Sequence, residues 1–206
     1  MRSRTPRLAA DARRRQILDA TLRVVARDGY AGLTMEVIAK EAGVTRTPLY
    51  AIFGDLETLL RAAADEGEAR ARAAIPEDVF MAPQDTTPAG VLSHATRRFL
   101  DAVQADPLTW QVLLLPASGT PEAVRRRYER NRVEVVQAVE HVVRWGLPQL
   151  GLEQGTDPHL IARVIVGVGE DLGRMVLAEP DRWPPERVAD AIGDIVRLVP
   201  AQEAAA

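Results

Sequence analysis

Residues 33–60, LTMEVIAKEAGVTRTPLYAIFGDLETLL, decide the fold of this chain. They read as two short helices joined by a tight turn, followed by the start of a third helix. Ala39 is small enough for two crossing helices to approach closely, and Gly43 can take a positive φ without steric cost. The core of such a unit is expected to hold Ile38, Val44, Leu49 and Ile52. These spacings are typical of a helix-turn-helix, and the alternative is an ordinary corner between two helices.

Polar residues mark where these helices begin. Thr34, Thr45 and Asp55 are each expected to cap the helix that follows. Pro48 suits a first helical turn, because the backbone N–H groups there have no partner within the helix. The second helix then turns Leu49, Ile52 and Phe53 inward. It leaves five residues facing outward on the part of a recognition helix that contacts DNA bases: Thr45, Arg46, Thr47, Pro48 and Tyr50.

Composition separates a basic head from an acidic body. The chain of 206 residues carries a net charge of −3, but residues 1–60 carry +3 and the remainder −6. This distribution fits a small DNA-binding head on a body with another task. No apolar run is long enough to span a membrane, and the basic N-terminus lacks the apolar segment of a secretion signal. A cytoplasmic protein without membrane contact is therefore expected.

The N-terminal region is expected to be a flexible basic arm, residues 1–10, followed by an amphipathic helix over 11–28 that Gly29 ends. Arg13, Arg14 and Arg15 would stand in the first turns of that helix. Cations there oppose the helix dipole, which favours acids, so an anionic partner close by is inferred.

The rest of the chain repeats one helix-start signal, a capping residue followed by proline: Thr87-Pro88, Asp106-Pro107, Thr120-Pro121 and Asp157-Pro158. Helices are expected at about 55–74, 88–105, 107–115, 121–146, 158–178 and 185–199, with a loop over 75–87. No stretch alternates as a strand does, so the expected class is all-α with about nine helices. The expected domains are the arm, a helix-turn-helix domain over 11–54, and a helical body over 55–206 whose first helix connects it to the head.

Two body helices predict a homodimer. The helix over 158–178 is apolar nearly all round and contains Gly167, Gly169 and Gly173, each costing about 1 kcal/mol relative to alanine in a helix. Close packing against another helix would offset that cost. The helix over 185–199 adds a second apolar stripe: Val188, Ile192, Ile195, Val196 and Val199. Two such helices from each of two copies would form a four-helix bundle, and the alternative is burial within one chain.

The motif residues together resemble one known family. Thr34, the IAKEAGV block at 38–44, Leu49-Tyr50, Phe53 and the Glu57/Leu59/Leu60 helix start are similar to the DNA-binding domain of the TetR family of bacterial transcriptional repressors. The resemblance covers about residues 13–60. It implies a homodimer, a palindromic operator in double-stranded DNA and a small-molecule effector held in the body.

Two positions depart from the family pattern. The resemblance implies a lysine on a DNA phosphate where this chain has Leu56, and a basic or aromatic residue where it has Ala51. Contacts to phosphate would then depend on Thr34, Arg46 and Tyr50, together with the helix N-termini.

No catalytic constellation is found, and neither a catalytic residue, a metal nor a cofactor is expected. The three histidines lie far apart without ligand spacing, and there is no cysteine, phosphate-binding glycine loop or nucleophile elbow. Glu170 and Asp171 are an adjacent acid pair, but neighbouring helical residues point about 100° apart and cannot face each other. This pair of acids is expected either to form a salt bridge to Arg163 or Arg174, or to form the polar end of a ligand pocket.

The pocket that the resemblance implies has seven candidate residues: His94, Phe99, Trp110, Leu113, Tyr128, Arg132 and Glu170. Such pockets are mainly apolar, with a few polar groups that orient the ligand, and core packing is the alternative role. The expected function is a transcriptional repressor released from its operator by a small-molecule effector. The alternatives are a helix-turn-helix activator, a protein-interaction module and, least favoured, a helical enzyme.

Overall fold

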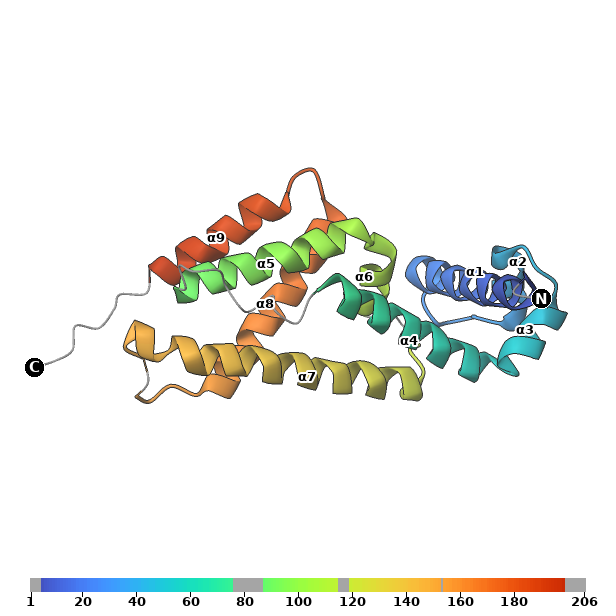
Figure 1. The fold of residues 1–206 in the computed structure, drawn as a ribbon, viewed down its shortest axis with the longest axis horizontal. Helices are drawn as coiled ribbons and strands as arrows, with labels where there is room; N and C mark the ends of the chain where they lie inside the picture. The colour runs from blue at the N-terminus through green and yellow to red at the C-terminus, as the bar shows by residue number, and fades with distance from the viewer. Residues whose placement is uncertain (1–4, 76–86, 115–118, 153, 199–206) are drawn as a thin grey trace, which may run out of the picture. The chain divides into compact units, whose positions relative to one another are not determined.

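The computed structural model describes residues 5–75, 87–114, 119–152 and 154–198, with side chains from residue 10 onward, and all regular elements in these ranges are helical (Figure 1). The all-α class is thus confirmed. The chain divides into two compact units, residues 1–71 with 108–128, and residues 72–107 with 129–206. In the ranges described, no helix is both long and apolar enough to cross a membrane. The limits of arm, head and body given above stay a prediction.

The first unit is built on the N-terminal helices. They are α1 (Thr5–Asp28), α2 (Met35–Ala42), α3 (Arg46–Phe53) and α4 (Leu56–Ala74), the last belonging to this unit as far as residue 71. Its fully buried large side chains are Ile17, Leu18, Leu22, Ile38, Leu49 and Leu59. Val112 of α6 (Pro107–Leu114) and Val124 of α7 (Glu122–Gly146) join the same core. The sequence assigned α6 and α7 to the body, so this contribution is new.

The first helix begins earlier than predicted, at Thr5. Residues 5–10 of the expected arm are therefore helical, while residues 1–4 lie outside the described part. Pro6 is tolerated in a first turn, and the leucine and alanines after it have high helix propensity. Residues 13–15 consequently lie in the third turn, whereas the dipole acts mainly within the first. The dipole thus gives no reason to expect an anion beside these arginines.

Side chains tie the first two helices together. Gln16 donates from Nε2 to the carbonyl oxygen of Ala42 at 2.8 Å, which satisfies one carbonyl at the end of α2. The carboxylate of Glu41 accepts from Nε of Arg23 and from Nη1 of Arg27, both at 3.0 Å. These two hydrogen bonds lower the pKa of Glu41 below its usual value.

A polar cluster connects α4 to the first turns of α7. Arg127 forms ion pairs with Asp65, 2.9 Å from its Nε, and with Glu68, 2.8 Å from its Nη2, and Glu68 is only 7% exposed. The hydroxyls of Tyr128 and Tyr30 lie 3.4 Å apart, and burial raises the pKa of both phenols, so both are neutral near pH 7. The start of α7 is thus held to this unit by charge and hydrogen bonding as well as by Val124.

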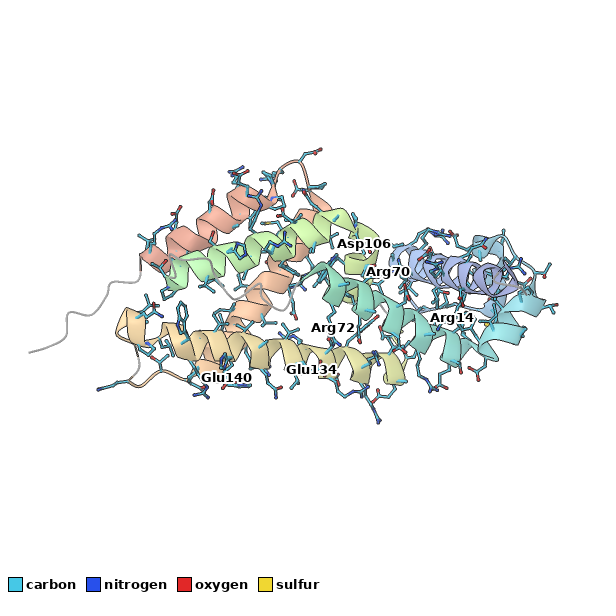
Figure 2. The ribbon with its side chains drawn as sticks, viewed as in Figure 1. Arg14, Arg70, Arg72, Asp106, Glu134 and Glu140 are labelled. Carbon is cyan, nitrogen blue, oxygen red and sulfur yellow. The ribbon has the colours of Figure 1, made fainter. Side chains whose placement is uncertain are left out.

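Two arginines, both labelled in Figure 2, join other helices of the unit. The guanidinium of Arg14 lies 5.6 Å from the ring centroid of Phe53, a cation–π contact between α1 and α3. Arg70 of α4 forms ion pairs with Asp19 of α1 and, at 3.0 Å, with Glu66.

The second unit contains α5 (Pro88–Ala105), the rest of α7, η2 (Pro148–Leu150), α8 (Pro158–Ala178) and α9 (Pro185–Arg197). In Figure 1 α9 lies along α5. Glycine is needed at this crossing, because a Cβ on Gly193 would stand 3.1 Å from Cβ of Ser93. Helices α7 and α8 pack through an apolar seam, made by Val136, Val139, Val143, Leu147, Ala162 and Val166.

The helix-start signals in the sequence predicted the caps of this unit correctly. Thr87 Oγ1 accepts from the Gly90 N–H at 3.1 Å, and Asp157 accepts from the N–H groups of His159 at 2.9 Å and Leu160 at 3.2 Å. The predicted limits of α5 and α8 are confirmed, and those of α6, α7 and α9 differ by one or two residues. The short helix η2 was not predicted. The expected loop falls mainly on residues 76–86, outside the described part.

Candidate functional site

The turn between α2 and α3 is a closed hydrogen-bonded unit. Thr34 Oγ1 accepts from the Val37 N–H at 3.2 Å, as predicted for a cap. Gly43 has φ of 65°, donates to Lys40 at 3.2 Å, and is followed by Val44, whose N–H donates to Ala39 at 3.0 Å. This pair of bonds is a Schellman motif, which ends α2 and fixes the direction in which α3 leaves.

The first turn of α3 faces solvent. Thr45, Arg46 and Thr47 are exposed, Pro48 is half-buried and Tyr50 is 52% exposed. Thr45 occupies the cap position in an extended conformation, but its side chain makes no capping hydrogen bond, so that part of the prediction is wrong. Side-chain capping is optional at this end of the helix, because the exposed N–H groups are accessible to water. The residues predicted to contact DNA thus share one exposed turn, with Thr34 at the start of α2.

Inward-facing positions on α3 are fewer than predicted. Leu49 is fully buried and Phe53 is 6% exposed, but Ile52 is 37% exposed and lies outside the core. Adjacent helical residues lie about 100° apart, so with Phe53 directed inward Ile52 is rotated towards solvent. Val44 is half-buried against the core, as expected.

One contact of this surface was missed from the sequence. The guanidinium of Arg46 pairs with the carboxylate of Glu36, in the first turn of α2. Both side chains are exposed, by 58% and 70%. The residues lie ten apart across a turn, so only the helix-turn-helix geometry, and not a helical spacing rule, could have suggested the pair.

The start of α4 explains one departure from the family pattern. Leu56 is half-buried against the core of the first unit, so it serves packing at a position where lysine would meet a phosphate. Ala51 is exposed. Asp55 accepts from the Thr58 N–H at 2.7 Å, which confirms the predicted cap and lowers the pKa of Asp55.

The seven candidate effector residues fall into both units. Trp110, Leu113 and Tyr128 belong to the first, where Trp110 is buried and Tyr128 contacts Tyr30. The other four belong to the second: His94, Phe99, Arg132 and Glu170. Two surface hollows, on α9 and on α1, contain none of the seven. In the described part of the chain no three His, Asp or Glu side chains gather in a way that could hold a metal ion.

The salt bridge expected for the Glu170-Asp171 pair forms through Asp171, which pairs with Arg174 at 3.4 Å. Glu170 has a partner that was not predicted, because its carboxylate accepts from Arg132 Nε at 2.7 Å. Arg132 lies one helical turn before Val136, and Glu170 one turn after Val166, so this pair extends the apolar α7–α8 seam. It brings two candidate effector residues together and gives them a packing role as well.

The outer face of α8 carries an apolar stripe at four-residue spacing. Leu160, Val164 and Val168 are exposed by 58%, 57% and 44%. Near them, a Cβ on Gly167 or Gly169 would meet no atom of the described residues within 4 Å, so the close packing expected at these two glycines is not made by that part of the chain. The predicted apolar stripe of α9 is only partly exposed. Val188 is buried in the unit, whereas Ile195 is among the exposed apolar side chains of α9.

Comparisons with known proteins agree with this surface. A family model described as "Bacterial regulatory proteins, tetR family" matches residues 17–63. No curated protein matches the sequence. A solved TetR-like transcriptional regulator from Rhodococcus sp. RHA1 is 25% identical, with 89% of this chain and 91% of that chain covered and a TM-score of 0.67.

Two further solved structures share the fold at lower identity. AibR, in complex with isovaleryl coenzyme A and operator DNA, is 22% identical, with 92% of this chain and 99% of that chain covered and a TM-score of 0.70. FadR from Bacillus subtilis, in complex with stearoyl-CoA, is 17% identical, with 88% and 96% covered and a TM-score of 0.68. The capped helix-turn-helix, the family match over it and the shared all-helical fold lead to one assignment. Residues 17–63 match the tetR family of bacterial regulatory proteins, and the chain has the fold of a solved TetR-like transcriptional regulator.

Proposed function

We propose that the protein is a cytoplasmic repressor that binds a palindromic operator in double-stranded DNA and is released by a small-molecule effector. The observation that carries this proposal is the exposed first turn of α3, held by the Schellman turn at Gly43 and the cap at Thr34. A recognition helix needs base-contacting side chains free in solvent on a backbone that does not move.

Each exposed residue has a proposed role on DNA. Arg46 contacts a guanine, whose O6 and N7 accept two hydrogen bonds from a guanidinium. Thr47 and Pro48 contact a thymine methyl group. Thr34, Thr45 and Tyr50 contact phosphate oxygens, which position the head without reading sequence.

A homodimer would present two such helices to one operator. We propose that it forms through α8 and α9, supported by the exposed stripe at Leu160, Val164 and Val168 and the open space at Gly167 and Gly169. Two recognition helices about 34–36 Å apart would enter successive major grooves of the operator. An effector that favours a different body conformation would disturb this spacing, by as much as its affinities for the two conformations differ.

Acyl-coenzyme A thioesters are the first effectors to test, because isovaleryl-CoA and stearoyl-CoA are bound in two structures of similar fold. The proposed contacts remain His94, Phe99, Trp110, Leu113, Tyr128, Arg132 and Glu170. Arg132 is a suitable group for a phosphate or carboxylate, which would compete with Glu170 for its guanidinium.

The central experiment is selection of genomic DNA fragments by the purified protein. A shared palindrome among the bound fragments is expected, and a reporter gene placed behind it should be silenced by the protein and restored by an effector. Recovery of fragments without a shared sequence would contradict the proposal, and activation of the reporter would favour the activator alternative.

Arg46→Ala tests the recognition residue. We expect a loss of about 1–3 kcal/mol that is confined to one base position in each half-site, because only that base loses its bidentate partner. Tyr50→Phe is the control, since loss of a phosphate contact weakens all sequences alike. Titration of operator variants by fluorescence anisotropy measures both. Unchanged operator binding by Arg46→Ala would show that another residue reads the sequence.

A further inference from the structure

The ion pair between Glu36 and Arg46 places an acid beside the residue proposed to read the operator. Arg46 is the first residue of α3, where a cation is disfavoured by the helix dipole, and Glu36 stands in the first turn of α2, where an anion is favoured. Both dipoles therefore hold the carboxylate in place, and the carboxylate holds the guanidinium.

The pair is exposed enough to open. With side chains 58% and 70% exposed, it is screened by water and salt, and it is no permanent structural bridge. When the pair opens on DNA, the carboxylate of Glu36 is left unpaired beside a polyanion, which is unfavourable. Arg46 gains little by exchanging a carboxylate for a single phosphate, but a guanine offers two acceptors in the geometry of a guanidinium.

We propose that Glu36 restrains Arg46 and lowers its contribution to DNA binding: the acid retains Arg46 on non-operator DNA and releases it where a base edge provides two acceptors. This inference rests on the proposed function and adds a second residue to its recognition site. On non-operator sequences Arg46 stays neutralised by Glu36 and displaces no counterion. The acid therefore weakens operator binding by the free energy of opening the pair, and it weakens non-specific binding by the smaller free energy of the phosphate contact that Arg46 does not make.

Glu36→Gln should thus free Arg46 for phosphate. On a scrambled duplex the slope of log K against log salt should steepen by about 0.9 for each Arg46, or about 1.8 for the proposed dimer, which is roughly an eightfold gain in affinity per subunit at about 0.1 M salt. Operator affinity should rise by at least the same factor, because the wild-type protein has to open the pair there and leaves Glu36 unpaired beside the DNA. The ratio of operator to scrambled binding should therefore not fall.

The chain offers a matched control in Glu57→Gln. Glu57 is also an exposed acid in the first turn of a helix of the same unit, and it pairs with Arg61 at 2.7 Å, not with Arg46. Glu57→Gln removes the same charge as Glu36→Gln, so any general effect of charge appears in both variants. The double variant Glu36→Gln with Arg46→Ala should lose the gain seen in Glu36→Gln alone.

The probes are the operator recovered by selection and a scrambled duplex of equal length, titrated by anisotropy over a series of salt concentrations. The inference is supported if the steeper slope on the scrambled duplex and the gain in operator affinity occur in Glu36→Gln alone. Equal changes in Glu36→Gln and Glu57→Gln overturn it while the proposed function stands. Wild-type protein that binds both duplexes equally overturns the proposed function, and this inference with it.

Discussion

At the scale of single residues, two glycines test the turn between α2 and α3, because one has a positive φ and the other lies inside a helix. Gly43 has φ of 65°, a region in which an L side chain costs about 1–2 kcal/mol. Gly67 lies inside α4, and a Cβ there would make an ordinary contact at 3.9 Å to Leu22. We expect Gly43→Ala to destabilise the protein by about 1–2 kcal/mol, and Gly67→Ala to stabilise it by up to about 1 kcal/mol. Urea unfolding followed by circular dichroism measures both, and changes of equal sign would contradict the turn geometry.

Individual residues also show which predictions depended only on neighbours in the sequence. Thr34, Gly43 and Asp55 act on backbone groups within three or four residues, so the spacing in the sequence was sufficient to identify them. The prediction that Ile52 faces inward was wrong, because the apolar character of a residue does not tell which of several apolar positions on a helix faces the core. Glu36 was missed because its partner lies across a turn.

At the scale of elements, the contact between α1 and α2 should respond to acid. The pKa of Glu41 is lowered by Arg23 and Arg27, so its contribution to stability is fully present above its ordinary value of 4.5 and is lost as pH falls through the lowered value. Glu41→Gln should therefore reduce the melting temperature at pH 7 and make no difference near pH 3. Glu57→Gln, on an exposed pair within α4, is the control. A Glu41→Gln effect that persists at pH 3 would assign it to packing and not to charge.

The connection between α4 and α7 gives a second test at this scale. Arg127→Leu leaves the nearly buried Glu68 without this ion pair, and we expect a loss of about 2–3 kcal/mol, below the range for fully buried pairs because Arg127 is 37% exposed. Arg126→Leu is the matched control one residue earlier. Arg126 is 67% exposed and pairs with Glu122, so its loss should be below about 0.5 kcal/mol. Similar unfolding free energies for the two variants would show that the cluster does not support the unit.

At the scale of the whole molecule, the exposed stripe of α8 should decide the oligomeric state. Light scattering at micromolar concentration is expected to give twice the mass of the chain. Val164→Asp should weaken the dimer at least tenfold, about 1.4 kcal/mol, because the interface would bury an unpaired charge. Val133→Asp is the control, since Val133 is 55% exposed on α7 and lies outside the stripe. A monomeric wild type, or equal dissociation of the two variants, would exclude this interface.

The sequence by itself determined most of the helices, the caps at Thr34, Asp55, Thr87 and Asp157, and the family resemblance of the head. These features depend on interactions between residues a few positions apart, and the relevant chemistry is visible in the order of side chains. The all-α class, the limits of α5 and α8 and the exposed first turn of α3 were all predictable for this reason.

Tertiary structure alone decided which distant residues meet. It placed Val112 and Val124 in the core of the first unit, paired Arg132 with Glu170 and Arg46 with Glu36, and buried Val188 of α9 within its own unit. Each of these depends on how two helices are rotated about their axes and how they cross. Those angles are set by the summed packing of many side chains, so no single spacing along the chain encodes them.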